Sequence, residues 1–243
     1  MGRHARIAQL ARLEEPGLQA VDLGCGVGRT VRQLLAYEPA VVHALDQASN
    51  LDDDLLHDAR VVSRIVDLDG GLPLPEASVD RVTSLNTVEH LADPVAHLGE
   101  VHRVLRPGGL LVLAHSDWDT ALFTSTDDTL TRLLVDQFVA VVPTWADRAD
   151  GFMGRKLPAL ADASGSRGAP FELLRLDSWA DPHRRFDDGS VAYKVAVGML
   201  AAAADDPELA ERSTGWFDGL HRLAEDDQFL FTVTDVAVVL RRL

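Results

Sequence analysis

The sequence predicts an α/β fold built on a largely parallel sheet, and three observations support this. Apolar stretches typical of buried strands alternate with helical patterns from Leu18 to His115. The first strand, Leu18 to Leu23, breaks into three glycines at alternate positions before a helix begins. The 243 residues suffice for one such domain, which buries about 70–75% of its unfolded surface.

Five strands and three helices are expected in the first half of the chain. The strands fall near residues 18–23, 40–45, 61–66, 79–85 and 109–115, and the helices near 29–37, 49–58 and 94–104. The third helix has a clear start, because Asp93 can cap it and Pro94 suits its first position. The turn Arg106-Pro107-Gly108-Gly109 ends this helix and starts the fifth strand.

The second half predicts two further strands separated by long insertions. We expect strands at 171–176 and 229–241, and helices at 126–141, 189–204 and 207–224. The whole chain, 1–243, is interpreted as one domain: a short helical segment (1–17, helix near 2–13), a core (18–116), a helical insertion (117–170) and a terminal strand pair (171–243) interrupted near 179–228. The two insertions are expected to form a helical cap over the carboxyl ends of the strands.

Composition excludes several classes of function. The formal charge of −15 argues against a nucleic-acid partner, since phosphate binding needs a basic surface. Cys25 is the single cysteine, so no intrachain disulfide can form. The first ten residues do not resemble a signal peptide, and no apolar run is long enough to span a bilayer. These features predict a soluble, cytoplasmic protein, monomeric or homodimeric, without a membrane partner.

The glycine turn is typical of a ligand site at a helix N-terminus, and its charges indicate which ligand. Asp22 precedes Gly24, Gly26 and Gly28, and a carboxylate there would repel the pyrophosphate of a dinucleotide. Arg29 occupies the position where a dinucleotide-binding pattern has its third glycine. S-adenosylmethionine carries an ammonium and a sulfonium instead, and both suit an acid at this position.

This segment resembles motif I of the class I (Rossmann-like) S-adenosylmethionine-dependent methyltransferases. Further segments in the right order are similar to the small-molecule (type 11) subgroup typified by the enzymes of quinone biosynthesis: Val41 to Asp46, Val61 to Leu68, Ser78 to Asn86, Glu89 to Pro94 and Val104 to Gly109. The resemblance implies a doubly wound seven-stranded sheet in the order 3-2-1-4-5-7-6 with the last strand antiparallel. It also implies S-adenosyl-L-methionine as cofactor and S-adenosyl-L-homocysteine as product.

The resemblance further implies a set of cofactor-binding residues. Asp46 would accept both ribose hydroxyls, Asp67 the adenine amino group, and the Leu68 amide would face the ring. Asp46 could instead cap the adjoining helix, and Asp67 could belong to a turn with Asp69-Gly70-Gly71. The complete set comprises Asp22, Gly24, Cys25, Gly26, Gly28, Asp46, Gln47, Asp67, Leu68 and Asn86.

Residues for the acceptor side are expected after the fourth and fifth strands. His115 and Asp117 could form an imidazole–carboxylate pair that removes a proton, or His115 could be satisfied by loop hydrogen bonds. Glu89 and His90 could line the substrate pocket or cap a helix. The aromatic residues of the first insertion could line the pocket or form a satellite core; they include Trp118, Phe123, Trp145 and Phe152. Asp52 to Asp54 indicate a helix start, and no metal is expected.

The leading hypothesis is a methyltransferase acting on oxygen or nitrogen, less favourably carbon, of a small and fairly apolar organic acceptor, as in specialised metabolism. Two alternatives stay open at this point. One is an S-adenosylmethionine-binding protein without methyl transfer, regulatory or using the sulfonium in other chemistry. The other is a nicotinamide-dependent oxidoreductase, which Asp22 and Arg29 disfavour.

Overall fold

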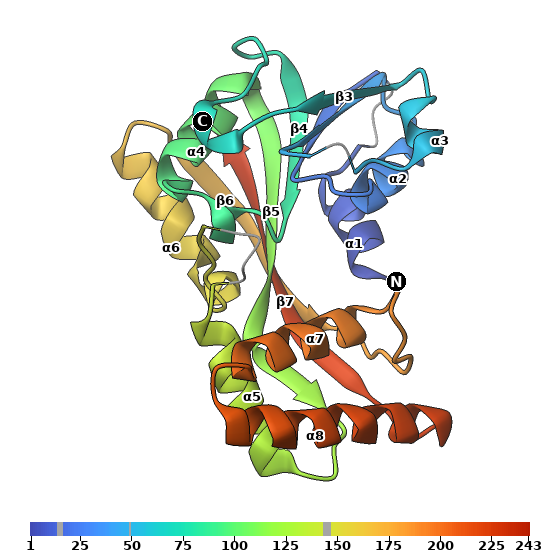
Figure 1. Cartoon of the computed structure of the whole chain (residues 1–243). Coiled ribbons are helices and arrows are strands. Elements are labelled where there is room, and N and C mark those ends of the chain that lie inside the picture. Colours follow the sequence, from blue (N-terminus) through green and yellow to red (C-terminus); the bar gives the residue numbers. More distant parts are fainter. Residues whose placement is uncertain (14–16, 49, 143–146) are drawn as a thin grey trace. The chain divides into compact units, whose positions relative to one another are not determined.

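The computed structural model describes residues 1–13, 17–48, 50–142 and 147–243 and groups them into two compact units (Figure 1). Unit 1 comprises Met1–His115, Gly154–Ser178 and Val236–Leu243. Unit 2 comprises Ser116–Met153 and Trp179–Asp235. The division lies close to the predicted insertions, with one difference: residues 154–178, mostly assigned to the first insertion, belong to unit 1.

One seven-stranded sheet has the predicted order, β3-β2-β1-β4-β5-β7-β6, and its last strand is antiparallel. Its strands are β1 (Gln19–Leu23), β2 (Val41–Asp46), β3 (Val61–Ile65), β4 (Val79–Leu85), β5 (Leu105–Phe123), β6 (Phe171–Ala180) and β7 (Phe231–Arg242). Strands β1 to β5 each run parallel to their neighbours among these five strands. Strands β5, β6 and β7 each contribute residues to both units.

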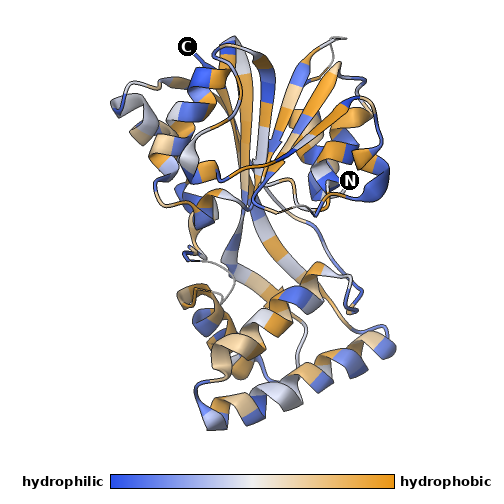
Figure 2. Cartoon of the chain, turned by 45° about the horizontal axis from the view of Figure 1, so that its top comes forward, coloured by the Kyte–Doolittle hydropathy of each residue, from blue (hydrophilic) through white to orange (hydrophobic). Residues whose placement is uncertain are grey.

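The helices of unit 1 follow from the strand order. Connections between parallel strands are right-handed. From β1 the chain adds strands on one side of the sheet as far as β3, and from β4 it adds them on the other side, so the helices before and after this reversal cover opposite faces. Accordingly α1 (Arg3–Leu10), α2 (Arg29–Leu35) and α3 (Asp53–Leu56) lie on one side of the sheet, and α4 (Pro94–Val104) and α6 (Met153–Ser166) on the other (Figure 1). Hydrophobic residues are concentrated along the strands between them (Figure 2).

Local signals placed most of these elements correctly. Asp93 caps α4 as predicted, accepting from the Ala96 amide at 2.9 Å, with Pro94 in the first turn. The turn predicted at Arg106-Pro107-Gly108-Gly109 is instead a bulge inside β5, which begins at Leu105: the pairing of β5 with β4 jumps from Leu105 to Leu110 while β4 advances only from Val79 to Arg81. The bulge between these pairs holds Gly108 at φ +78°.

Four elements differ from the prediction. Strand β5 continues to Phe123 rather than ending near 115, and β6 continues to Ala180. The helix predicted at 49–58 is a single turn, α3, and Ser49 lies outside the described residues. Helix α6 was not predicted, because Gly154, Pro158 and Gly165 are unfavourable within a helix.

Unit 2 has a hydrophobic core of its own. Helices α5 (Asp128–Ala140), α7 (Val191–Ala203) and α8 (Pro207–Glu225) pack around the outer residues of β5 and β7. Phe123 lies at its centre, with its ring centroid 4.6 Å from that of Phe231 and 5.4 Å from that of Trp216. Trp216 Nε1 donates to Thr131 Oγ1 at 2.9 Å, so the buried indole is satisfied.

Two strands of unit 2 are joined by a buried polar contact. Ser116 Oγ donates to Asp235 Oδ1 at 2.7 Å, and both residues are buried. The bond lies where β5 continues past residue 115, the predicted end of this strand. No helix within the described residues is long and apolar enough to cross a membrane. The expectation that the two insertions form a cap over the carboxyl ends of the strands depends on how the two units are placed. It stays a prediction.

Phe123→Ala should lower the free energy of unfolding by about 3–5 kcal/mol, because a core aromatic ring is replaced by a cavity. Urea denaturation followed by circular dichroism measures this loss. Leu122→Ala is the matched control, since the neighbouring Leu122 side chain is 67% exposed and should change stability little. An unchanged unfolding curve for Phe123→Ala would restore Phe123 as a candidate pocket residue.

Candidate functional site

The parallel register brings the predicted cofactor residues of unit 1 to one edge of the sheet. Leu23 at the end of β1 pairs with Leu45 of β2 and with Ser84 of β4. Asp46 pairs with Ile65 of β3, and Leu85 with Ala114 of β5. The residues that follow these strands therefore share the carboxyl edge where α/β sheets bind ligands. They include Gly24, Gln47, Asp67, Asn86 and His115.

The three glycines of the turn are required for two different reasons. A Cβ on Gly24 would overlap the Thr87 side chain, and one on Gly28 would overlap Leu51 and Leu55. Gly26 differs from both, because its Cβ would meet no atom within 4 Å although its φ of +51° is left-handed. The space above Gly26 is open, so bare backbone is presented where a ligand can approach.

Asp46 anchors this turn. Its Oδ2 accepts from the Gly26 amide at 2.7 Å, and its Oδ1 accepts from the Ala48 amide at 3.2 Å. The carboxylate thus holds the glycine turn from the adjacent strand end. A carboxylate oxygen has more than one lone pair, so both oxygens retain capacity for ribose hydroxyls. The predicted ribose role stays a prediction, and no helix is capped by Asp46.

Asp22 is a buried acid beneath the turn. It is 3% exposed, and Thr83 Oγ1 donates to its Oδ1 at 2.7 Å. Burial, with a further contribution from the Asp46 charge, raises the Asp22 pKa to about 7, and the Thr83 hydrogen bond only partly opposes this. A cation bound near the turn would favour the charged form. Burial also raises the pKa of the Cys25 thiol to about 12, so this cysteine stays protonated.

The predicted adenine-binding segment is a short 3₁₀ turn, η1 (Leu68–Gly70), held by α4. Asp67 caps it by accepting from the Asp69 amide at 3.0 Å, so the turn interpretation of Asp67 is confirmed, and its role toward adenine stays a prediction. From α4, His97 Nδ1 lies 3.2 Å from the Leu68 carbonyl oxygen, and Glu100 Oε2 accepts from the Leu72 amide at 3.0 Å. These two side chains of α4 thus hold the loop.

A buried acid–histidine cluster follows β4 and β5. Glu89 lies in the 3₁₀ turn η2 (Val88–His90), and its Oε1 is 3.2 Å from His115 Nε2 and 3.3 Å from His90 Nε2. Burial alone would raise the Glu89 pKa, but hydrogen bonds from His115 and His90 outweigh it and hold that pKa at about 2. His115 is fully buried. The sequence proposed Asp117 as its carboxylate partner, whereas this contact comes from Glu89.

The remaining acceptor-side candidates belong to unit 2. Asp117 is buried, and its carbonyl accepts from Thr120 Oγ1 at 2.7 Å. Phe123 is a core residue, so the satellite-core interpretation holds for it. Trp118 packs edge-on against Phe138 with ring centroids 6.0 Å apart, at the margin of the same core. Phe152 is partly buried, and Trp145 lies outside the described residues.

Several supporting residues were not found from the sequence. Thr87 Oγ1 donates to the Leu23 carbonyl at 3.1 Å and fills the space beside Gly24. Thr83 contacts Asp22, and His97 and Glu100 contact the loop that contains Leu68. Each of these contacts joins distant parts of the chain. The positive φ of Asn86, +53°, marks a strained position at a strand end, which is typical of functional sites. Within the described residues, no three His, Cys, Asp or Glu side chains are grouped to hold a metal ion.

Comparison with known proteins agrees with this geometry. Residues 21–113 match the methyltransferase domain family Methyltransf_11. The methyltransferase GfsG of Streptomyces halstedii is 30% identical over 208 residues, which cover 83% of this chain and 69% of that protein. The chain belongs to the S-adenosylmethionine-dependent methyltransferases.

Two further comparisons show how much of its relatives' length this chain spans and which fold it shares with them. An uncharacterized 37.1 kDa protein of a Streptomyces fradiae transposon is 32% identical over 83% of this methyltransferase-family chain and 59% of its own length. The chain spans less than two thirds of several curated relatives that it matches. The crystal structure of an S-adenosylmethionine-dependent methyltransferase from Mesorhizobium loti has the same fold, with a TM-score of 0.54, 21% identity and 98% coverage of both chains.

The site residues fit the cofactor of this family. The open space at Gly26 accepts a ligand against backbone, and the carboxylates of Asp22 and Asp46 suit its cationic aminoacyl part and its ribose hydroxyls. The same two acids would repel a pyrophosphate bound on the turn. Asp22, Gly26 and Asp46 would hold S-adenosylmethionine here.

Gly26→Val should abolish S-adenosylhomocysteine binding measured by calorimetry, because its side chain would fill the space left for the ligand. Gly108→Val is the matched control: Gly108 has φ +78° and equally open space, but it lies in the bulge of β5 rather than in the glycine turn after β1. Both variants carry the same kind of backbone strain, and only the first should lose binding. Normal binding by folded Gly26→Val would contradict the assignment of the turn.

Cofactor affinity should rise with pH and level off above about pH 7. Ionised Asp22 attracts the bound cation, whereas protein with protonated Asp22 must lose a proton on binding, so affinity falls by up to about tenfold per pH unit below its pKa of about 7. Calorimetry of S-adenosylmethionine in buffers of different ionisation enthalpy counts the released proton. Asp22→Asn should bind the cofactor more weakly, and its affinity should not depend on pH in this range. If the affinity of this variant still rises with pH, another titrating group causes the dependence.

Proposed function

We propose that the protein transfers the methyl group of S-adenosylmethionine to an oxygen or nitrogen of a small, fairly apolar organic acceptor. The observation that carries this proposal is the turn at Gly26, open to a ligand and held by Asp46 above the buried acid Asp22. The formal charge of −15 supports a small-molecule acceptor over a nucleic acid. A place in specialised metabolism is part of the same proposal.

When bound, S-adenosylmethionine supplies a methyl carbon activated by its sulfonium for in-line displacement. The chain then has to orient both reactants, exclude water and remove a proton. Asp46 orients the ribose and holds the Gly26 backbone in position for the aminoacyl part. The Asp22 carboxylate offsets positive charge in a region where burial strengthens the interaction.

His115 and Glu89 form the pair we propose for the proton. Glu89 Oε1 faces His115 Nε2 at 3.2 Å, and the low pKa of Glu89 keeps that carboxylate charged. A charged carboxylate stabilises the imidazolium that forms when His115 accepts a proton. Asp117, two residues further along β5, is retained as the weaker candidate from the sequence.

The second candidate function is cofactor binding without methyl transfer. The complete burial of His115, with its Nε2 against Glu89, favours it, because a base must reach the proton it removes. Turnover separates the two functions. Bound cofactor with no S-adenosylhomocysteine formed against a broad panel of hydroxyl and amine acceptors would support the second.

The cofactor itself is tested by calorimetry with S-adenosylhomocysteine, NAD(H) and NADP(H). S-adenosylhomocysteine should bind and the nicotinamides should not. Asp46→Ala should weaken binding by about 1.5–3 kcal/mol, because a charged acceptor of hydrogen bonds is lost. Asp188→Ala, at an exposed acid of unit 2, is the control of equal charge change. Preferential binding of a nicotinamide would overturn the proposal.

His115→Ala should reduce kcat by about 10²–10⁴-fold with little change in S-adenosylhomocysteine affinity. Glu89→Gln keeps the shape of the side chain but removes its charge, so by destabilising the imidazolium it should shift the rise of kcat with pH to lower pH. Rates of the wild type should fall below a pKa in the histidine range. A flat profile, with unchanged kcat in His115→Ala, would show that His115 is structural.

A further inference from the structure

The loop that follows β3 is held at both of its ends. At its start, the Val66 amide donates to the Asp46 carbonyl at 2.7 Å. At its other end, the Leu72 amide donates to Glu100 Oε2 of α4 at 3.0 Å. Between these two points lie residues 67–71, which include both residues predicted to contact the adenine of the cofactor. The contacts at the two ends therefore limit how far this part of the chain can move.

Arg103 of α4 strengthens the contact at Leu72. Its Nε and Nη2 donate to the two carboxylate oxygens of Glu100 at 2.9 and 2.8 Å. The same guanidinium donates from Nη2 to the Leu72 carbonyl and from Nη1 to the Leu74 carbonyl, both at 2.9 Å. The planar fork of an arginine suits such paired contacts, and a lysine cannot reproduce them. The Glu100–Arg103 pair thus binds both the amide and the carbonyl of Leu72.

This pair lies close to the loop backbone and is charged at neutral pH. Gly71 has φ +95°, and a Cβ at this position would lie 3.2 Å from Glu100 Oε2. Hydrogen bonds from Arg103 lower the Glu100 pKa to about 2, so the carboxylate is ionised at pH 7. Hydrogen bonds with one charged partner are stronger than those between neutral groups.

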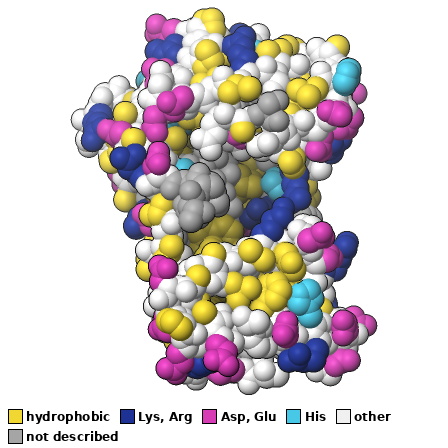
Figure 3. Space-filling model, viewed as in Figure 1, with side chains coloured by type: hydrophobic (Ala, Val, Ile, Leu, Met, Phe, Trp, Pro, Cys, Tyr) yellow, Lys and Arg dark blue, Asp and Glu magenta, His cyan; other side chains and the backbone are white. Residues whose placement is uncertain are grey.

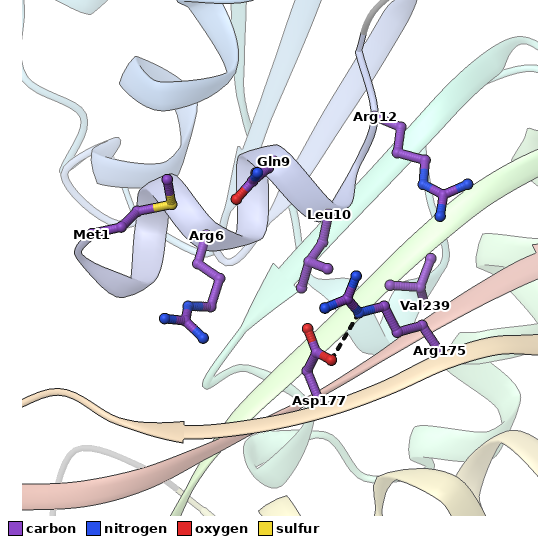
Figure 4. Close-up of a pocket in the computed structure, with 8 residues that line it drawn as sticks. All are labelled: Met1, Arg6, Gln9, Leu10, Arg12, Arg175, Asp177 and Val239. Carbon is purple, nitrogen blue, oxygen red and sulfur yellow. Dashed lines mark hydrogen bonds and ion pairs between the residues drawn. The ribbon is translucent and has the colours of Figure 1, made fainter.

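Most ion pairs on a protein surface do not hold the backbone in this way. Asp, Glu, Lys and Arg side chains are spread over the face shown in Figure 3, and exposed pairs contribute little to stability. The Arg175–Asp177 pair of β6, drawn in Figure 4, joins two side chains of one strand at 2.7 Å. The Glu100–Arg103 pair differs, because it joins α4 to three main-chain groups of residues 72–74.

We propose that Glu100 and Arg103 are positioning residues that fix the loop at 67–71 so that it distinguishes adenine from other bases. Both act through the loop backbone rather than by touching the ligand. A fixed loop presents its hydrogen-bonding groups without an ordering cost at binding, and a mismatched base leaves some of these groups unpaired. This role rests on S-adenosylmethionine as cofactor and on the adenine contacts proposed for Asp67 and Leu68, not on methyl transfer.

Calorimetric titration of the whole chain with S-adenosylhomocysteine and S-inosylhomocysteine tests this role. The second ligand carries hypoxanthine in place of adenine and therefore lacks the amino group. The wild type should prefer S-adenosylhomocysteine. Arg103→Lys and Glu100→Gln should each reduce this preference by about three- to tenfold, the equivalent of one hydrogen bond. The double variant should lose no more than either single variant, because the two residues act as one unit.

Arg60→Lys and Asp58→Asn are the matched controls, because they change a similar pair at the opposite end of β3. Arg60 Nε and Nη2 donate to the two carboxylate oxygens of Asp58 at 3.0 and 2.7 Å. Arg175→Lys, in the pair of Figure 4, is a further control. All three variants should keep the ligand preference of the wild type.

The side chains of Arg103 and Glu100 are 35% and 33% exposed, so both variants should fold, and thermal unfolding checks this. A lower melting temperature with unchanged ligand preference would show a purely structural pair and overturn the proposal. Equal binding of both ligands by the wild type would also overturn it, since the loop would then read no base. Binding of neither ligand would reject the cofactor site together with this role. A normal preference without methyl transfer to any acceptor would reject the proposed function and leave the positioning role intact.

Discussion

The contact between Asp46 and the Gly26 amide is the interaction on which the candidate site depends. It joins the end of β2 to the turn that follows β1, and it does so at 2.7 Å with a charged acceptor. The Gly24 amide also donates to the Leu45 carbonyl at 2.8 Å, so the end of β2 holds the glycine turn at two points. Thr87 completes this by closing the other side of the turn at Gly24.

Two buried acids of unit 1 show how environment assigns different roles to the same chemical group. Burial raises the pKa of Asp22 to about 7, because one neutral hydroxyl is a weak compensation for lost water. Glu89 is also buried, yet two histidines hold its pKa at about 2. In the proposed site the first acid would respond to a cation that arrives with the cofactor, whereas the second lies beside His115 and His90.

All the predicted cofactor residues lie in unit 1, within the parallel strands or in the segments that follow them. Unit 2 is stabilised by its own aromatic and aliphatic core, of which Phe123 is a central member. Phe123, an aromatic residue of the first predicted insertion, therefore contributes to the stability of unit 2. Trp118 and Phe152, which are only partly buried, retain the potential to contact an acceptor.

The sequence by itself determined the sheet order, the glycine turn, the capped start of α4 and, through Asp22, the kind of cofactor, because each depends on neighbours within a few residues or on a motif. Tertiary structure decided the rest. Ser116 of the extended β5 meets Asp235 of β7, and Glu89, which lies beside His115, is 26 positions away from it in the sequence. Such contacts join residues far apart in the chain, and no local periodicity or propensity records which distant side chains the folded sheet will bring together.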